Sequence, residues 1–209
     1  SAGSPVADSL QVDETNLATN ASAGFASLFS ANYGADGPGS ATTYSLQVSV
    51  NGVDSGLDDV ATGSNILLYL ESGQVVGRVG GTTGAVSFTV SVNASGVVTL
   101  DQQRAIAHAP NTTADQESSL ASANLVQLSA TVVDGDGDSS SAILNLGSVI
   151  SFRDDGPSIS AGVATADSLQ VDESNLATNA NVSFAGAFTS SYGADGVGTI
   201  TYALTVSAA

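Results

Sequence analysis

The chain has 209 residues and a formal net charge of −17, because 20 acidic side chains are offset by only 3 from lysine and arginine. Nucleic acids and anionic membrane surfaces are bound through basic patches, so this balance argues against both as partners. The chain has no cysteine, which excludes disulfides and thiol chemistry, and no apolar run of about 20 residues that would predict direct membrane insertion.

The first segment of note is an octapeptide, ADSLQVDE, that occurs twice. It spans residues 7–14 and returns 159 positions later at 166–173, and the nearby segments NLATNA and YGADG return with it. Self-similarity at a fixed period marks a tandem array, and this period has the size of a domain. We therefore predict one complete repeat over residues 1–159 and the first third of the next over 160–209, with the phase of the fold relative to the repeat left open. Neighbouring repeats of the same chain are the expected partners, and the chain by itself is expected to be monomeric.

The next segment predicts a helix. In SAGFASLFSAN (22–32), Phe25, Leu28 and Phe29 recur at helical spacing, and the second copy repeats this spacing from Phe184 to Phe188. We therefore expect a short amphipathic helix near the start of each repeat.

The remaining elements alternate with a period of two residues. Residues 43–50 (TYSLQVSV) and 86–92 (VSFTVSV) alternate apolar and polar side chains, and residues 65–79 predict a hairpin that turns at 71–73. Further apolar segments lie at 97–100, 125–133 and 141–152. About seven short strands separated by Gly, Asn, Asp and Ser predict an all-β fold, an antiparallel Ig-like β-sandwich.

The segment VVDGDGDSSS is the sharpest candidate for chemistry. It brings three carboxylates into five residues: Asp134, Asp136 and Asp138. Their repulsion favours a hard cation, and calcium suits carboxylates on a flexible glycine-containing loop. An EF-hand is excluded, because Ser139 and Asn145 stand where that loop needs Gly and Glu. The alternative is a solvated acidic turn.

The boundary between the repeats is also acidic. The linker RDDGP has turn chemistry and supplies Asp154 and Asp155. Carboxylates that end one repeat and begin the next can share a calcium ion, and a plain turn is the alternative. The candidates from the repeated octapeptide are Asp8, Asp13 and Glu14 in the first copy and Asp167, Asp172 and Glu173 in the second. The two YGADG segments add Asp36 and Asp195, for which simple turn residues are the alternative.

No pattern in the chain predicts an enzyme. His108 is the only histidine, there is no cysteine or lysine, and no phosphate-binding glycine loop or zinc spacing occurs. A Ser-His-Asp set converges only in space, so abundant Ser and Asp carry no information. We expect His108 to be packed or hydrogen-bonded rather than catalytic.

Three motifs occur in order within one repeat: DQQRAIAHAPNTTADQE, SATVVDGDGDSSSAILNL and ISFRDDGP. This ordered set resembles the long tandem repeat of giant type I-secreted RTX adhesins of Gram-negative bacteria, the LapA-like biofilm proteins. The resemblance covers the complete repeat and implies an extracellular, calcium-binding β-sandwich extender at the bacterial cell surface. Such a module spaces a distal adhesive tip from the cell. The calcium roles that it implies fall on the DGDGD aspartates and on the linker pair.

Two other functions remain open. Each repeat could bind a glycan or peptide, so that an array would bind multivalently. Aromatic residues form only 5% of the chain, which disfavours a groove that stacks against sugars. A glycosidase would need a cleft with paired carboxylates.

Overall fold

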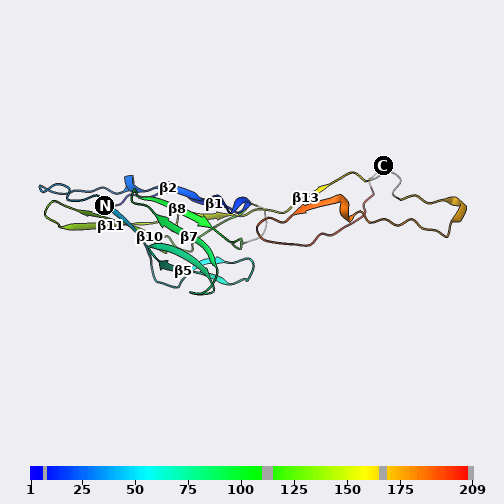
Figure 1. Cartoon of the computed structure of the whole chain (residues 1–209), viewed down its shortest axis with the longest axis horizontal. Helices are drawn as coiled ribbons and strands as arrows, with labels where there is room; N and C mark the ends of the chain where they lie inside the picture. The colour runs from blue at the N-terminus through cyan, green and yellow to red at the C-terminus, as the bar shows by residue number, and fades with distance from the viewer. Residues whose placement is uncertain (7–8, 110–114, 165–168, 207–209) are drawn as a thin grey trace.

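The computed structural model describes residues 1–6, 9–109, 115–164 and 169–206. Asp8 and Asp167, two of the junction candidates, lie outside these ranges. The described regular structure consists of strands and short 3-10 turns, which confirms the prediction of an all-β protein. Most strands form one body at the left of Figure 1, and the second copy extends from one end of it to the right.

The predicted segments at 43–50, 65–79, 86–92, 97–100 and 125–133 form strands, the segment at 141–152 divides into two strands, and six further strands of the described residues lie outside the predicted segments. The strands are β1 (Leu10–Asp13), β2 (Ala21–Gly24), β3 (Thr43–Val48), β4 (Val53–Asp58), β5 (Asn65–Glu71), β6 (Gln74–Val79), β7 (Val86–Val92), β8 (Val97–Gln102), β9 (Glu117–Ser119), β10 (Val126–Val133), β11 (Ser139–Asn145), β12 (Ile150–Arg153), β13 (Ser158–Ala161) and β14 (Phe188–Ser191). The 3-10 turns are η1 (Glu14–Asn16), η2 (Ala26–Leu28), η3 (Glu173–Asn175) and η4 (Ala185–Ala187).

The strands form a large antiparallel sheet and three smaller sheets. The large sheet has six strands in the order β2-β8-β7-β6-β5-β4, and a second sheet has the order β11-β10-β3. The predicted hairpin is confirmed, since Glu71 of β5 pairs with Gln74 of β6 across Ser72 and Gly73. Both turn residues have positive φ, 50° and 82°, as a two-residue type I′ turn requires.

A third sheet, β1-β12-β9, joins the two ends of the first repeat. β1 and β12 are parallel, with Leu10 opposite Ile150 and Asp13 opposite Arg153. The prediction of a purely antiparallel fold is therefore too simple. Because parallel strands end at the same edge of a sheet, the residues that follow them, Glu14 and Asp154, emerge side by side.

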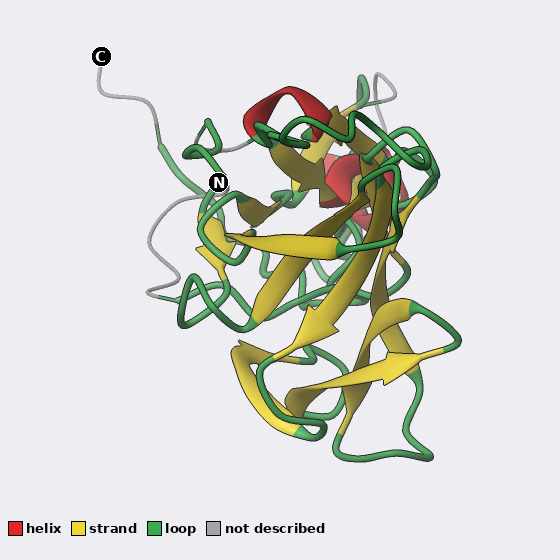
Figure 2. Cartoon of the chain, turned by 90° about the vertical axis from the view of Figure 1, so that its left-hand side faces the viewer, coloured by secondary structure: helices red, strands yellow, loops and turns green. Residues whose placement is uncertain are grey.

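One hydrophobic core holds these sheets together. Its buried residues come from all three sheets of the first repeat, and β3 contacts β5, β6 and β7 across it. Phe88 of β7 and Phe152 of β12 are both fully buried, with ring centroids 4.9 Å apart. The result is an all-β body of sandwich-like construction, in which strands supply nearly all the regular structure (Figure 2).

The predicted amphipathic helix is wrong. Residues 21–24 form β2 and pair with β8, and only the single 3-10 turn η2 follows. Pairing with β8 uses the backbone groups that a helix would need, and Phe25, the residue between β2 and η2, reaches the core with 2% exposure. In the second copy, too, a single 3-10 turn, η4, stands in place of the predicted helix.

The second copy keeps the local contacts of the first but exposes its apolar side chains. Gly3 N donates to Leu28 O at 2.7 Å, and Gly162 N donates to Ala187 O at the same distance. By contrast, Leu10 is fully buried while its counterpart Leu169 is 56% exposed. In the first copy Leu10 is covered by pairing of β1 with β12, and no strand of the described residues pairs in this way with 169–172.

The three arginines each bind a carboxylate. Arg78 binds a half-buried Glu71, Arg153 binds an exposed Asp115, and Arg104 binds a fully buried Asp59. Arg104 Nε lies 2.7 Å from Asp59 Oδ1, and Thr62 donates to the same carboxylate through its N–H and its hydroxyl. The hydrogen bond from Arg104 is the main cause that lowers the pKa of Asp59, against the opposing effect of burial.

Replacing Arg104 with alanine is expected to destabilise the fold by about 3 kcal/mol, because it leaves a buried carboxylate with only Thr62 as donor. Urea unfolding at pH 7 measures this, with Arg153→Ala at the exposed pair as the control that changes little. The lowered pKa means that Asp59 stabilises the wild type above its unfolded-state pKa, and that this contribution is lost as the pH falls through the folded-state pKa. An Arg104→Ala protein as stable as Arg153→Ala would contradict the prediction.

Candidate metal centre

Two acidic clusters lie in the described part of the chain, and the first is exposed. It contains Asp36, Asp134 and Asp136, with carboxylate oxygens within 4.8 Å of one another. Asp36 and the DGDGD loop are about 100 positions apart in the sequence, but the fold brings the YGADG loop against the DGDGD loop. Gly39 N donates to Val133 O at 2.9 Å, which holds the two loops together.

Glycine permits this contact between the loops. A Cβ on Gly39 would lie 1.7 Å from the carbonyl oxygen of Asp134, and one on Gly135 would lie 2.5 Å from that of Asp36. Such distances are shorter than any real contact, so neither position accepts another residue without a shift of backbone.

The DGDGD loop is ordered by its own first carboxylate. Asp134 Oδ1 accepts hydrogen bonds from the N–H groups of Asp138, at 2.8 Å, and Gly137, at 3.2 Å. A side-chain hydrogen bond with Asp136, together with these backbone bonds, lowers the pKa of Asp134. Asp138 closes the loop through its backbone, and its side chain is not part of the cluster. The structure therefore joins two of the three predicted aspartates with Asp36.

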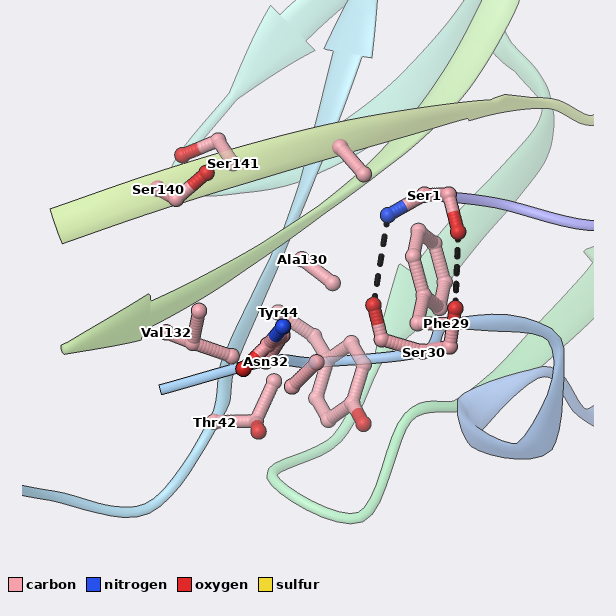
Figure 3. A pocket seen from close by; sticks show the side chains of 12 residues that line it. Ser1, Phe29, Ser30, Asn32, Thr42, Tyr44, Ala130, Val132, Ser140 and Ser141 are labelled. Carbon is pink, nitrogen blue, oxygen red and sulfur yellow. Dashed lines mark hydrogen bonds between the residues drawn. The ribbon is translucent and has the colours of Figure 1, made fainter. Parts of the chain in front are cut away.

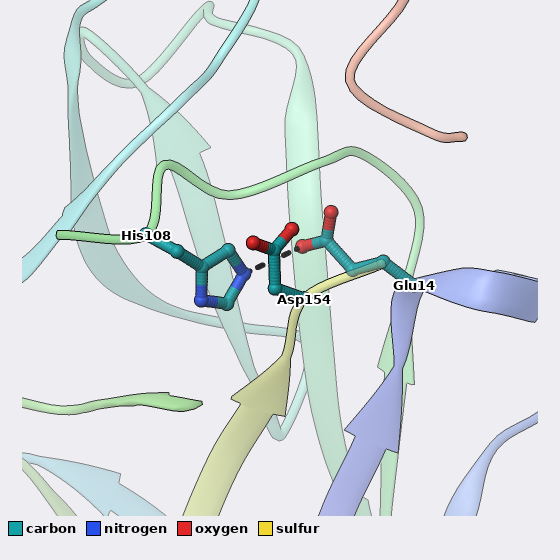
Figure 4. A group of neighbouring side chains, drawn as sticks. All are labelled: Glu14, His108 and Asp154. Carbon is teal, nitrogen blue, oxygen red and sulfur yellow. Dashed lines mark hydrogen bonds and ion pairs between the residues drawn. The ribbon is translucent and has the colours of Figure 1, made fainter. Parts of the chain in front are cut away.

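The second cluster is buried at the end of the parallel pair β1–β12. It contains Glu14, which follows β1, Asp154, which follows β12, and His108 (Figure 4). Glu14 is 2% exposed and Asp154 7% exposed. Glu14 Oε1 accepts hydrogen bonds from Gln102 Nε2 at 2.6 Å and Ile106 N at 2.9 Å, and lies 3.4 Å from His108 Nε2.

Three polar atoms of this cluster have no hydrogen-bond partner among the described residues: Glu14 Oε2, Asp154 Oδ1 and His108 Nδ1. Burial is the main cause that raises the pKa of Asp154, and the charges of Glu14 and Asp155 add to it against the opposing charge of His108. For His108 burial lowers the pKa, but the hydrogen bond and charge of Glu14 with the charges of Asp154 and Asp195 raise it above its usual value. The cluster thus concentrates negative charge where water has little access.

The linker and the second copy extend this buried cluster. Asp154, Asp155 and Asp195 also have carboxylate oxygens within 4.8 Å of one another. Asp155 accepts hydrogen bonds from Ala194 N, at 3.2 and 3.1 Å, so the YGADG loop of the second copy holds the linker of the first. Gly193 has φ of 71°, and a Cβ there would lie 2.3 Å from the Asp155 carboxylate.

The other predicted junction residues do not join either cluster. Asp13 and Asp172 cap the 3-10 turns η1 and η3, accepting from Thr15 N at 2.9 Å and Ser174 N at 2.8 Å. The hydrogen bonds from Ser174 lower the pKa of Asp172. Glu173 is exposed, and η3 lies far to the right of the linker in Figure 1. The structure places Glu14 of the same repeat and Asp195 of the next beside the linker, in place of Asp172 and Glu173.

His108 is packed and hydrogen-bonded, as predicted, but its partner Glu14 and the hydrogen bond from Gln102 to Glu14 were not predicted. No local pattern marks either residue, because both reach Glu14 from segments about 90 positions away along the chain. Asp195 could be identified from the sequence, because it lies in the same YGADG motif as Asp36.

A separate pocket lies at the other end of the first repeat, with a volume of about 330 Å³ (Figure 3). Its lining combines the rings of Phe29 and Tyr44, 6.0 Å apart, with serine and threonine hydroxyls. Ser1 binds Ser30 across its rim through both its amine and its hydroxyl. No aspartate, glutamate or histidine lines this pocket, so it is distinct from both acidic clusters.

These features define a class: an acidic all-β tandem repeat with carboxylates gathered at the boundary between copies. The chain belongs to the family described as domain of unknown function (DUF5801), whose model matches residues 9–147 and 168–209. No curated protein and no solved structure matches the chain. Within the described residues, no helix is long and apolar enough to cross a membrane.

Proposed function

We propose that the chain is a calcium-stabilised extender module of a large repetitive bacterial surface adhesin. In such a protein the repeats project a distal adhesive region away from the cell, so length and stiffness are the function. The observation that carries this proposal is the pair of buried carboxylates, Glu14 and Asp154, at the boundary between near-identical copies, each with one oxygen that has no hydrogen-bond partner among the described residues. A buried charge without a partner is costly, and a bound cation would offset that cost.

Calcium is the cation that this arrangement favours. Both clusters offer oxygen ligands from several carboxylates on loops, and calcium accepts six to eight oxygens in flexible geometry. Millimolar extracellular calcium would fill even weak sites, which agrees with a location outside the cell.

The motif resemblance supports the remaining parts of the proposal. The ordered motifs around His108, the DGDGD loop and the RDDGP linker resemble the extender repeats of RTX adhesins, which implies an Ig-like sandwich, type I secretion and a role in biofilms. The N-terminus lies toward the left of the first repeat and the second copy extends from its right end, an arrangement that supports a head-to-tail array (Figure 1).

A binding module is the second candidate. The pocket beside Phe29 and Tyr44 favours it, because two rings and several hydroxyls could contact a small polar ligand such as a sugar. A structural rather than enzymatic role is supported by His108, whose side chain is 2% exposed and directed at Glu14.

The stiffness of the junction tests the proposal. The chain has no cysteine, so the exposed residues Ser95 and Asn179 can be replaced by cysteine and spin-labelled, one in each copy. Double electron–electron resonance is expected to give a narrow distance distribution in calcium and a broad one in excess chelator, because carboxylates that repel one another would let the copies separate.

The double substitution Asp154→Asn and Asp155→Asn should give the broad distribution even in calcium. Asp172→Asn is the matched control, a carboxylate of the second copy that lies outside both clusters, and it should keep the narrow one. Identical wild-type distributions with and without calcium would refute the proposed calcium-dependent stiffness. Saturable binding of a glycan at the pocket would favour the second candidate.

A further inference from the structure

The carboxylates of Glu14 and Asp154 lie close together at the junction, and one oxygen of each has no donor among the described residues (Figure 4). Glu14 Oε2 and Asp154 Oδ1 have no hydrogen-bond partner among the described residues, and each belongs to a residue more than nine-tenths buried. Buried carboxylates in folded proteins are normally hydrogen-bonded, paired or bound to a metal. The unpartnered oxygens therefore point to a ligand.

The other oxygen of Glu14 is fixed by the protein. Oε1 accepts hydrogen bonds from Gln102 Nε2 at 2.6 Å and from Ile106 N at 2.9 Å, and His108 Nε2 lies 3.4 Å from it. These donors hold the carboxylate in one orientation and leave Oε2 free, as outer groups do around metal ligands. His108 thus lies behind Glu14, as an orienting neighbour of a ligand and not as a ligand itself.

The next repeat completes the set of oxygens. Asp195 belongs to the YGADG loop of the second copy, and its carboxylate lies with those of Asp154 and Asp155. Within each of the two overlapping groups the oxygens are no more than 4.8 Å apart. Two oxygens no farther apart than 4.8 Å can both lie at a calcium–oxygen distance, about 2.3 to 2.6 Å, from a single ion.

We propose that a calcium ion binds at this junction between Glu14 and Asp154 of one repeat and is enclosed by Asp155 and by Asp195 of the next. This inference rests on the proposed function and goes further, because it names the ligands and makes the site incomplete without the following repeat. The ion would then connect the copies directly, and the YGADG loop would be the part of each repeat that receives it.

The repeated sequence also relates the exposed cluster of Asp36, Asp134 and Asp136 to the junction site. Asp36 is the counterpart of Asp195, and it lies with Asp134 and Asp136 in the first copy. In a longer array the DGDGD loop of each repeat would therefore lie beside the residue that closes the junction with the repeat before it.

Calcium titration of the whole chain by isothermal calorimetry tests the site. Asp195→Asn is expected to weaken one calcium site by at least about 10-fold, as is Asp154→Asn. Asp195 is exposed and makes no hydrogen bond to another described residue, so its replacement should not disturb the fold, which circular dichroism would check. Asp36→Asn is the matched control, since it changes the same motif in the first copy and should leave this junction site unaltered.

Each other outcome overturns a defined part of the proposal. If the wild type binds calcium and only Asp36, Asp134 or Asp136 substitutions weaken it, the junction site is wrong while the proposed function survives. If the wild type binds no calcium, both are wrong. If zinc binds more tightly than calcium and His108→Gln abolishes that binding, histidine is a ligand and the assignment to calcium is wrong.

Discussion

Excess calcium is expected to raise the melting temperature of this chain by about 5 to 10 °C for each site filled, relative to excess chelator. A ligand that binds only the folded state at 100 times its Kd adds about 2.7 kcal/mol of stability. One kcal/mol corresponds to about 2 to 4 °C for a domain of this size. The large effect follows from a net charge of −17 and from the carboxylates gathered in the two clusters.

The experiment is thermal unfolding followed by circular dichroism, with magnesium chloride at matched ionic strength as the control for screening. Replacing Asp134 and Asp136 with Asn should remove the part of the calcium-dependent stabilisation that comes from the exposed cluster. The melting temperature should then fall in calcium and change little in chelator. Equal wild-type midpoints in calcium and chelator would show that the acidic clusters do not stabilise the fold through calcium.

Replacing Phe152 with alanine is expected to destabilise the first repeat by about 3 to 5 kcal/mol. Its ring is fully buried, lies 4.9 Å from that of Phe88, and anchors the strand that pairs with both β1 and β9. The loss would combine the apolar surface of the ring with the cavity left behind it. Urea unfolding in saturating calcium measures the free energy, so that the state of the metal sites is held constant.

Phe188→Ala provides the matched comparison. This ring lies in the second copy, is 38% exposed and meets Tyr202 at 5.6 Å, so its removal should leave the main unfolding transition almost unchanged. If Phe152→Ala and Phe188→Ala shift that transition equally, the two ends of the first repeat do not share one core as described.

Strand positions were largely predictable from local patterns. The alternating segments at 43–50 and 86–92 became β3 and β7, and the hairpin at 71–73 was correct, because a half-buried strand needs a period of two whatever its partner. The helix at 22–32 was not correct. Phe25, Leu28 and Phe29 satisfied a helical period, but the competing partner β8 lies far along the chain and no local pattern reveals it.

The candidate sites were predictable to different degrees. The DGDGD loop was recognisable because its carboxylates are adjacent in sequence, and the structure adds Asp36 from a distant loop. At the junction, Glu14, Asp154 and Asp155 were predicted, but Glu14 was expected beside the linker of a preceding repeat. It lies instead beside the linker of its own repeat, since η1 starts where the parallel pair ends.

The sequence by itself determined the tandem repeat, the acidic character and the strand-forming segments of this protein, because each depends on the order or the kind of neighbouring residues. Only the tertiary structure decided that β1 pairs in parallel with β12 and that Glu14, His108 and Asp154 meet in a buried cluster. Strand pairing over about 140 positions depends on burying one shared core, and the energy of that burial is a property of the whole domain. A period of two identifies a strand but does not specify its partner, so the junction could be resolved only in three dimensions.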